Sequence, residues 1–354
     1  MESKTTHKGL LHGGDLLTAS KKTGIPVDQW LDLSTGISPY AYPSHSIPEA
    51  VFSKLPYIDQ AFNEHAKQYY GSDQFVALPG TQAAIQLMPS FLETFPVLLP
   101  SVGYQEHQQA WKKSGNQLDY YDALDEQNAF EEIELKLTKQ PKQHLLIINP
   151  NNPSSLIFTP QQLILWSKKL AKDAYLIVDE AFIDCLPSQS LVPVLSELST
   201  FNNIIVLRSF GKFFGLAGIR LGFVFAADTL LRKFEEHIPL WSINGPALYL
   251  ASKAFSDRAW QSEHHKKLFE SECFTRDLFE HLPYQACFHQ RLFSSYVFPK
   301  TLALTIFNEF YCKGVLLRLI DLSKDKYILR VGRICKEDVR AREKIRAVFK
   351  EFDA

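Results

Sequence analysis

The sequence has few cysteines and no long apolar run, and each lack excludes a class of protein. Its five cysteines are an odd number, and the closest pair, Cys273 and Cys287, are 14 residues apart. Neither a metal site of the CxxC kind nor a paired disulfide framework is therefore predicted. No stretch reaches the roughly 18 consecutive apolar residues of a membrane span, and the first residues lack the apolar centre of a secretory signal. We expect a cytoplasmic protein without metal or membrane partner.

A surplus of charge is also missing. Lys and Arg number 38 against 39 Asp and Glu, which gives a formal net charge of -1. Bulk charge would therefore not attract the chain to nucleic acid. The composition, 45% hydrophobic, 13% aromatic and 22% charged, is typical of a globular protein. At about 150 residues per domain, 354 residues favour two domains.

Short apolar runs alternate with helical patterns between about residues 75 and 225. This alternation predicts a mostly parallel, seven-stranded type of sheet in an α/β domain. Helices are expected over 81–95 and over 160–171, the second with Thr159 as N-cap and Pro160 in the first position. The strands are expected at residues 75–78, 97–99, 144–148, 175–178, 204–207 and 221–225.

The pattern changes after Pro246. A long polar helix is expected at about 257–281, followed by a strand at 295–298, a helix near 302–312, strand-like VLLRLI and YILRV, and a charged terminal helix. The first forty-odd residues, rich in Gly, Ser and Pro, indicate an arm with turns. We therefore predict an N-terminal arm (1–45), a large α/β domain (46–250) and a small α+β domain (251–354) on which the arm packs.

The most specific segment is the glycine-rich run RSFGKFFGLAGIRLG at 208–222, which follows an expected strand. With its neighbours it resembles the fold-type I pyridoxal phosphate enzymes. The resemblance implies that Lys212 forms a Schiff base with the cofactor and that Ser209 and Arg220 hold its phosphate. An amine among cations in a shielded pocket can be neutral near pH 7, and a guanidinium with a hydroxyl matches a phosphate. Many members carry Ser or Thr where this chain has Gly211.

Two further motifs follow expected strands. LIVDEAF ends a strand with Asp179, which the resemblance places against the pyridine nitrogen of the cofactor. NPNNP contains Asn152, which would contact both cofactor and substrate. On their own these residues could be a helix cap and a turn. Phe182 stands where many relatives have a tyrosine, and Ser154-Ser155 stands where they have Thr-Gly.

Two weaker motifs complete the cofactor site. Gly80, Thr81 and Gln82 lie between a strand and a helix, where backbone N–H groups can bind a phosphate, although a simple N-cap would explain them equally. Tyr104 aligns with the family aromatic that stacks on the pyridine ring, although core packing is the commoner role. Tyr57 lies near the position of a family tyrosine that reaches the neighbouring subunit, in an uncertain register.

The two ends of the chain narrow the resemblance. HGGD at 12–15, DLSTGISP at 32–39 and the lysine segment look like the L-threonine-O-3-phosphate decarboxylases of cobalamin biosynthesis. Relatives usually have Asn at the position of Ser38. A substrate with a carboxylate and a phosphate needs fixed cations, and two arginines lie inside apolar strand-like runs. They could instead reach solvent on amphipathic strands, or pair with Asp321 or Asp325. The implied substrate contacts are His12, Gly13, Gly36, Asn152, Arg318 and Arg330.

The resemblance implies decarboxylation of L-threonine O-3-phosphate to (R)-1-amino-2-propanol O-phosphate and carbon dioxide, with Lys212 and Asp179 as catalytic residues. The bond held perpendicular to the ring breaks, so orientation selects the reaction. Histidinol-phosphate aminotransferase is the alternative. A pyridoxal-phosphate-binding regulator is a remote third, because no basic DNA-binding module is evident. Family members are homodimers, so we expect a homodimer with a small phosphorylated amino acid as ligand.

Overall fold

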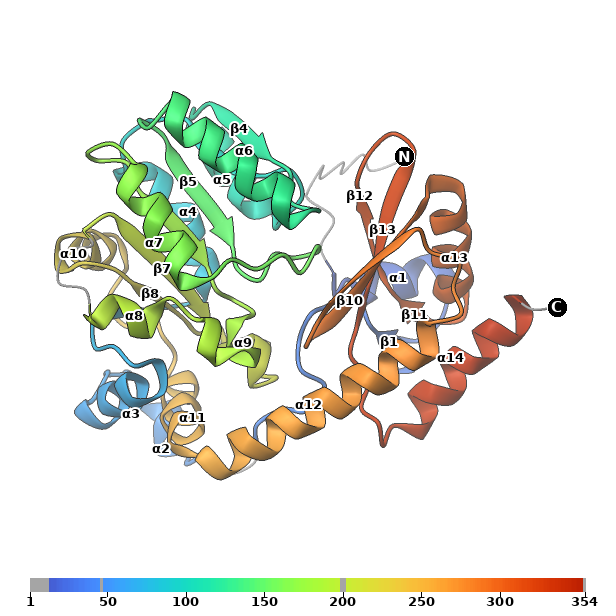
Figure 1. Cartoon of the computed structure of the whole chain (residues 1–354). Coiled ribbons are helices and arrows are strands. Elements are labelled where there is room, and N and C mark those ends of the chain that lie inside the picture. Colours follow the sequence, from blue (N-terminus) through green and yellow to red (C-terminus); the bar gives the residue numbers. More distant parts are fainter. Residues whose placement is uncertain (1–12, 45–46, 198–201, 353–354) are drawn as a thin grey trace, which may run out of the picture.

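The computed structural model describes residues 13–44, 47–197 and 202–352. These residues form a large lobe around one sheet and a smaller lobe around another, and the long helix α12 (Arg258–Phe279) runs from one lobe to the other (Figure 1). Along its described residues, the chain has no helix that combines the length and apolar character needed to cross a membrane.

The large lobe is built on a seven-stranded sheet of order β2-β8-β7-β6-β5-β3-β4. Five neighbouring strands, from β7 to β4, are parallel, and β8 runs antiparallel between β7 and β2. The predicted α/β class with a mostly parallel sheet is confirmed. The strands are β2 (Phe75–Leu78), β3 (Val97–Pro100), β4 (Leu118–Tyr121), β5 (His144–Ile148), β6 (Leu176–Asp179), β7 (Ile204–Ser209) and β8 (Gly222–Phe225).

Helices cover both faces of this sheet, because its central strands are apolar on both sides. In β5, Leu145 and Ile147 pack against one cluster, which includes α3, α6, α7 and α11, whereas Leu146 and Ile148 pack against α4, α5 and α10. The helices of this lobe are α2 (Ala50–Ser53), α3 (Gln60–Tyr70), α4 (Thr81–Phe91), α5 (Gln105–Lys113), α6 (Glu126–Lys139), α7 (Pro160–Lys169), α8 (Val192–Glu197), α9 (Phe210–Phe213), α10 (Asp228–His237) and α11 (Gly245–Ser256).

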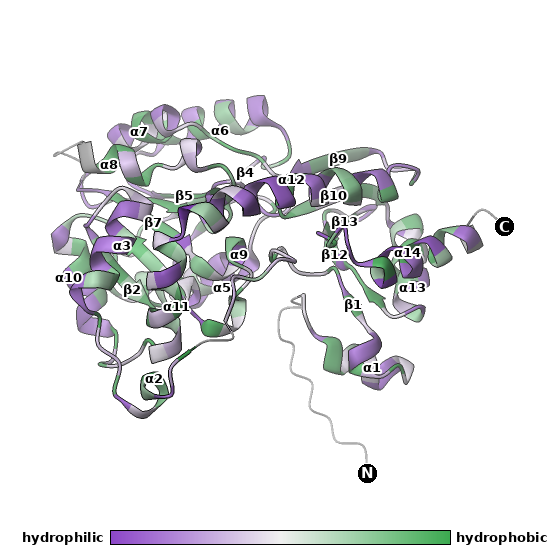
Figure 2. Ribbon diagram, turned by 90° about the horizontal axis from the view of Figure 1, so that it is seen from below, coloured by the Kyte–Doolittle hydropathy of each residue, from purple (hydrophilic) through white to green (hydrophobic). Residues whose placement is uncertain are grey.

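The smaller lobe holds an antiparallel sheet of order β12-β13-β10-β9. Its apolar face packs against α12, α13 and α14. The arm belongs with this lobe, since β1 (Leu31–Asp32) pairs with β11 and α1 (Leu16–Thr23) lies beside them (Figure 2). The other strands and α-helices of this lobe are β9 (Ala286–Gln290), β10 (Phe293–Pro299), α13 (Lys300–Cys312), β11 (Val315–Leu316), β12 (Arg318–Asp321), β13 (Lys326–Gly332) and α14 (Val339–Phe352).

The structure corrects several predicted details. The helix expected over 81–95 ends at Phe91, and the arm expected to consist of turns contains α1 and β1. Strands β4 and β9 were not predicted, because most of their side chains are only half-buried or exposed and the apolar signal is weak. The start of α7 is as predicted: Thr159 and Gln162 form a capping box, and Pro160 occupies the first position.

Candidate active site

The predicted cofactor motifs meet at one edge of the large sheet. Asp179 ends β6, where it pairs with Ile148 on one side and Leu207 on the other, so the NPNNP turn and Ser209 follow at adjacent strand ends. Gly222 pairs with both Leu78 and Ser209 across β8, which brings the Gly80 turn to the same edge. Carboxyl ends of parallel strands form the usual ligand crevice of open α/β sheets. The eight residues implied to bind cofactor together with Lys212 all line one cavity there: Gly80, Thr81, Gln82, Tyr104, Asn152, Asp179, Ser209, Lys212 and Arg220.

Lys212 lies in α9, directly after β7. Its Nζ atom makes no hydrogen bond to any described residue and lies 5.4 Å from the ring centre of Phe182. Burial and the positive charge of Arg330 lower the pKa of Lys212 from 10.5 to about 8, although Asp179 opposes them. The chain therefore places a lysine amine with an accessible neutral form at the centre of the cavity.

Asp179 is held by a residue that the sequence interpretation missed. Nε2 of His107 lies 2.8 Å from Oδ2 of Asp179, and the backbone N–H of Ala181 donates to Oδ1 at 3.0 Å. Both side chains are almost fully buried, and Nδ1 of His107 has no partner among the described residues. His107 follows Tyr104 by three residues at the start of α5, so helical spacing next to a predicted site residue was the only available signal.

The turn between β2 and α4 forms a cradle for an anion. Gly80 has φ of 84°, and a Cβ atom there would lie 2.8 Å from Nη2 of Arg220. A Cβ atom on Gly222 would lie 2.6 Å from the backbone nitrogen of Thr81. α4 has no side-chain N-cap, and its first two residues, Thr81 and Gln82, line the cavity beside the arginine. This combination is suited to a phosphate group.

Tyr104 lines both the cofactor cavity and a second cavity beside it. Its hydroxyl donates to Oε1 of Gln82 at 3.1 Å, and Nε2 of Gln82 donates to Glu106 at 2.7 Å. Burial, followed by the charge of Glu106, raises the pKa of Tyr104 to about 12. The tyrosine therefore stays neutral, with its ring fixed against the cavity.

A second cavity adjoins the first. It is lined by residues from the arm, from the large lobe and from the antiparallel sheet, and it shares Tyr104, Asn152 and Lys212 with the cofactor cavity. Of the implied substrate contacts, His12 lies outside the described residues. The other five all line this second cavity: Gly13, Gly36, Asn152, Arg318 and Arg330.

Two arginines stand opposite each other in this second cavity. Arg318 on β12 and Arg330 on β13 are register partners. Arg330 donates to Oδ1 of Asn152 and to the carbonyl oxygen of Ser34, both at 2.5 Å. Burial, then Arg318, lowers the pKa of Arg330 to about 9. Neither arginine forms an ion pair with a described carboxylate, so the alternative pairing with Asp321 or Asp325 is wrong.

The surroundings of Gly211 and Phe182 fit two of the departures from the family pattern, whereas Ser155 keeps a backbone conformation typical of the family glycine. A Cβ atom on Gly211 would lie 2.6 Å from Cα of Ala217, which leaves no room for Ser or Thr. Ser155 has φ of 62°, a conformation that favours glycine. Phe182 packs edge-on against Phe293 and lies against Gly36, where a Cβ atom would be 2.8 Å from its ring.

A buried charge cluster lies beneath the strand ends. Arg208 precedes Ser209 and forms ion pairs with Glu180, the residue after Asp179, and with Asp184. Tyr69 donates to Asp184 at 3.1 Å, and the guanidinium lies over the ring of Tyr70. Burial favours the neutral form, but the two carboxylates outweigh it and raise the pKa of Arg208. The cluster connects the two strands that carry Asp179 and Ser209.

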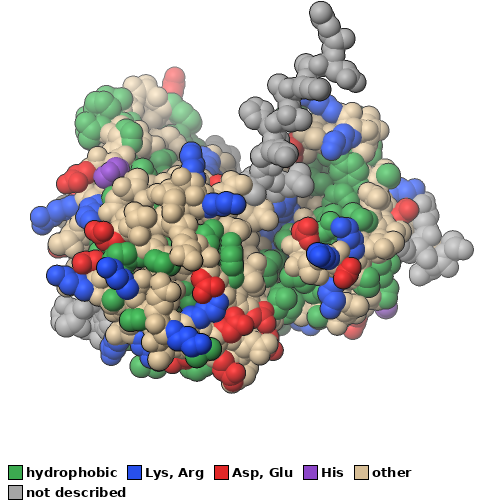
Figure 3. All heavy atoms as spheres, turned by 90° about the horizontal axis from the view of Figure 1, so that it is seen from above, with side chains coloured by type: hydrophobic (Ala, Val, Ile, Leu, Met, Phe, Trp, Pro, Cys, Tyr) green, Lys and Arg blue, Asp and Glu red, His purple; other side chains and the backbone are tan. Residues whose placement is uncertain are grey.

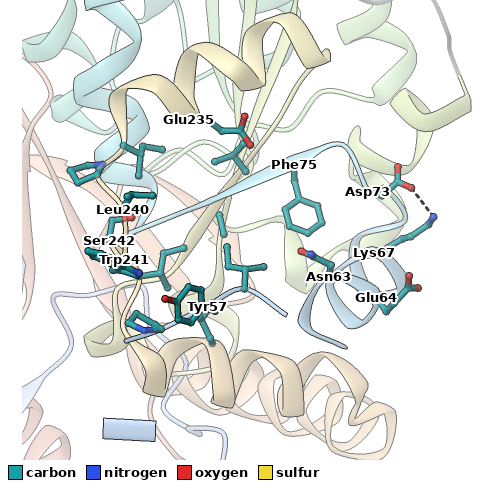
Figure 4. A pocket seen from close by; sticks show the side chains of 18 residues that line it. Tyr57, Asn63, Glu64, Lys67, Asp73, Phe75, Glu235, Leu240, Trp241 and Ser242 are labelled. Atoms are coloured by element: carbon teal, nitrogen blue, oxygen red, sulfur yellow. Dashed lines mark hydrogen bonds and ion pairs between the residues drawn. The ribbon is translucent and has the colours of Figure 1, made fainter. Parts of the chain in front are cut away.

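A larger hollow of about 800 Å³ lies apart from these motifs (Figure 4). Tyr57, Leu240 and Trp241 line one end of it, and the ion pair of Lys67 with Asp73 lies at the other. The side chains of Tyr57 and Leu240 are 72% and 81% exposed. Lys212 does not line this hollow, so Tyr57 is not part of the same subunit's cavity.

The residues at the sheet edge fit pyridoxal phosphate. The glycine cradle with Arg220 and Ser209 suits a phosphate, the Asp179 carboxylate suits a protonated ring nitrogen, and Lys212 suits an aldehyde carbon. In the adjoining cavity, the positive charges of Arg318 and Arg330 suit an anionic substrate beside the lysine amine.

The sequence is similar to a known protein family and to individual members of known function. Residues 34–298 match the model of the family described as aminotransferase class I and II. The chain is 36% identical over 296 residues to a threonine-phosphate decarboxylase of Pseudomonas aeruginosa, covering 83% of this chain and 86% of that one.

Solved structures give the same fold at lower sequence identity. Histidinol-phosphate aminotransferase from Sinorhizobium meliloti, solved in complex with pyridoxal-5'-phosphate, has a TM-score of 0.78, with 17% identity and 99% of each chain covered. L-threonine-O-3-phosphate decarboxylase from Porphyromonas gingivalis has a TM-score of 0.69, with 13% identity, covering 90% of this chain and 98% of that one. These likenesses establish the predicted fold class.

Proposed function

This chain belongs to the family of class I and II aminotransferases, and from that premise we propose that it is a pyridoxal-phosphate-dependent decarboxylase of L-threonine O-3-phosphate. The observation that carries the substrate class is the pair of arginines, Arg318 and Arg330, in a cavity shared with Lys212. A substrate with a carboxylate and a phosphate would supply the anions that these two cations lack.

Bound pyridoxal phosphate supplies a protonated ring that accepts the electron pair of a bond broken at the substrate's α-carbon. Asp179, fixed by His107, would keep the ring nitrogen protonated. Arg220, Ser209 and the backbone of Gly80–Gln82 would hold the phosphate of the cofactor.

Arg330 and Asn152 act on the substrate. The hydrogen bond between them fixes the guanidinium at the junction of the two cavities, where it can orient an acidic group of the substrate. By fixing that acidic group, Arg330 and Asn152 would set which bond at the substrate's α-carbon faces the cofactor site, and so would favour loss of the carboxylate as carbon dioxide over loss of the α-hydrogen. A proton must then reach the α-carbon, and Lys212, with its pKa lowered to about 8, can exchange one near neutral pH.

The direct test is incubation of purified, cofactor-loaded protein with L-threonine O-3-phosphate in the absence of a keto acid. We expect many turnovers that release carbon dioxide and 1-amino-2-propanol O-phosphate in equal amounts. The comparison reaction contains histidinol phosphate and 2-oxoglutarate. Amino transfer in that reaction, without carbon dioxide release in the first, would contradict decarboxylation and favour the aminotransferase alternative.

We also propose that the protein is a homodimer located in the cytoplasm. The support for the dimer is the hollow of Figure 4, where Tyr57, Leu240 and Trp241 are apolar and exposed. Ile243 also lines it, and the next residue, Asn244, donates to the carbonyl oxygen of Ile219, the neighbour of Arg220. Sedimentation velocity at several concentrations tests the dimer, and a monomer at all of them would contradict it. Over the face in Figure 3, charges of both signs are interspersed, so a nucleic-acid partner is not proposed.

A further inference from the structure

His264 lies on α12, far in sequence from every predicted site residue, and is only 2% exposed. Its ring stacks on Trp260 at 4.2 Å and meets Phe213 edge-on at 4.7 Å. Nε2 lies 2.7 Å from the carbonyl oxygen of Phe213 and 3.3 Å from Oγ of Ser38. A carbonyl oxygen can only accept, so Nε2 carries the hydrogen and donates it.

The carbonyl that His264 contacts belongs to the residue after Lys212. α9 has only four residues, and the last carbonyl groups of a helix have no partner within it. Here three successive carbonyls, of residues 212, 213 and 214, accept from outside the helix. Their donors are the N–H of Ser38 at 2.9 Å, Nε2 of His264 at 2.7 Å and the N–H of Tyr42 at 2.9 Å.

The arm therefore runs directly along the lysine segment. A Cβ atom on Gly215 would lie 2.8 Å from Cα of Ala41, so only glycine allows this approach. Oγ of Ser38 donates to the carbonyl of Tyr40 and accepts from the Tyr40 N–H at 3.1 Å. That leaves the hydroxyl oxygen a lone pair for the His264 N–H. One imidazole hydrogen thus lies between the arm and the lysine segment.

We propose that His264 is a positioning residue that fixes the backbone of Lys212 and joins the N-terminal arm to it. The arm carries Gly36 into the substrate cavity, so the same contact links the substrate side of the site to the amine. This inference rests on the proposed use of Lys212 as the cofactor-binding amine. Burial, with lesser effects of His265 and Lys267, lowers the pKa of His264 to about 4, so the ring is a neutral donor.

The test compares two amide substitutions. In His264→Gln the side-chain amide nitrogen can occupy the place of Nε2, whereas in His264→Asn it is one bond too short. The matched control is His265→Asn, because His265 also lies against the Phe213 ring, at 4.8 Å, and forms no hydrogen bond to a described residue. Each apo-protein is titrated with pyridoxal phosphate, and the absorbance of the lysine-linked cofactor is then followed against pH.

We expect His264→Asn to raise the dissociation constant of pyridoxal phosphate about 10-fold, the effect of losing one or two hydrogen bonds. The pH midpoint of the cofactor absorbance should move as well, since the amine shares its surroundings with Arg330, Asp179 and Arg220. His264→Gln should stay within about 3-fold of the wild type, because it keeps the donor. His265→Asn should match the wild type.

Equal behaviour of His264→Asn and His265→Asn would overturn the proposal. So would equal losses in His264→Asn and His264→Gln, since the effect would then come from packing and not from the donor. Ser38→Ala keeps the imidazole of His264 and the backbone N–H of residue 38. We expect it to raise the dissociation constant of pyridoxal phosphate, but by less than His264→Asn does. The titrations contain no substrate, so they remain decisive even if the decarboxylation assay fails.

Discussion

Two buried arginines show how differently the two sides of the site are built. Arg208, under the cofactor side, pairs with Glu180 and Asp184, and these carboxylates raise its pKa against the effect of burial. Arg330, on the substrate side, binds only neutral oxygens, and burial lowers its pKa to about 9. The first charge is neutralised within the protein, whereas the second is left for a ligand to neutralise.

The backbone follows the same division. The cofactor side comes from neighbouring strand ends of one sheet, so hydrogen-bond register fixes the relative positions of Asp179 and Ser209. The substrate side joins the arm, the NPNNP turn and the antiparallel sheet, whose residues meet only after the lobes pack. Stability is therefore concentrated on one side and ligand affinity on the other, and the predictions below test that division.

Lys212→Ala should give the largest effect. Loss of the amine removes the covalent attachment and the proton carrier together, so turnover should fall by at least about 1,000-fold. The absorbance of the lysine-linked cofactor should disappear, while circular dichroism shows an intact fold. A variant that keeps both absorbance and turnover would refute the central role of this residue.

Glu180→Gln tests the paired side. The substitution removes one of the two negative charges that neutralise the buried Arg208. Removal of one partner of a buried ion pair costs about 3 kcal/mol of unfolding free energy. Urea unfolding of the apo-protein provides the measurement. The control is Asp119→Asn, which breaks the pair with Lys136 at a half-exposed site and should cost less than about 1 kcal/mol. Equal losses in the two variants would contradict the division.

Arg330→Met tests the unpaired side. We expect KM for the phosphorylated substrate to rise about 10- to 100-fold, since a hydrogen bond to a charged group is worth about 1.5–3 kcal/mol. The affinity for cofactor should stay the same. The free energy of unfolding should change little, because removal of the buried charge offsets the lost hydrogen bonds to Asn152 and Ser34. An unchanged KM, or a large loss of stability, would show that this arginine is structural.

The same division explains what the sequence could predict. Asp179, Asn152 and Lys212 lie in linear motifs directly after apolar runs, so both the strands and the residues could be read locally. His264 could not, because nothing in the polar helix around it marks a contact with Phe213, and for His107 only its helical spacing from Tyr104 pointed to the site. One of the two partners of Arg330 was also hidden, since a backbone carbonyl such as that of Ser34 leaves no trace in side-chain chemistry.

The last prediction concerns pH, at the residue where the two sides meet. The pKa of Lys212 is about 8 in the folded protein, below its ordinary value of 10.5. Between these values the unfolded chain binds more protons, so the stability of the apo-protein should rise with pH, by at most about 1.4 kcal/mol per unit. The quantity to measure is the free energy of unfolding from pH 7.5 to 10, as wild type minus Lys212→Met.

This difference should increase with pH, and a flat difference would mean that the folded protein does not hold the amine in its neutral form. Arg330→Met sharpens the comparison. The charge of Arg330 is, after burial, the largest cause of the lowered pKa, so its removal should raise the pKa of Lys212 and reduce the slope in that background. If the slope of the unfolding free energy against pH stays the same, burial alone lowers the pKa of Lys212. In that case Arg330, on the substrate side, does not affect the amine.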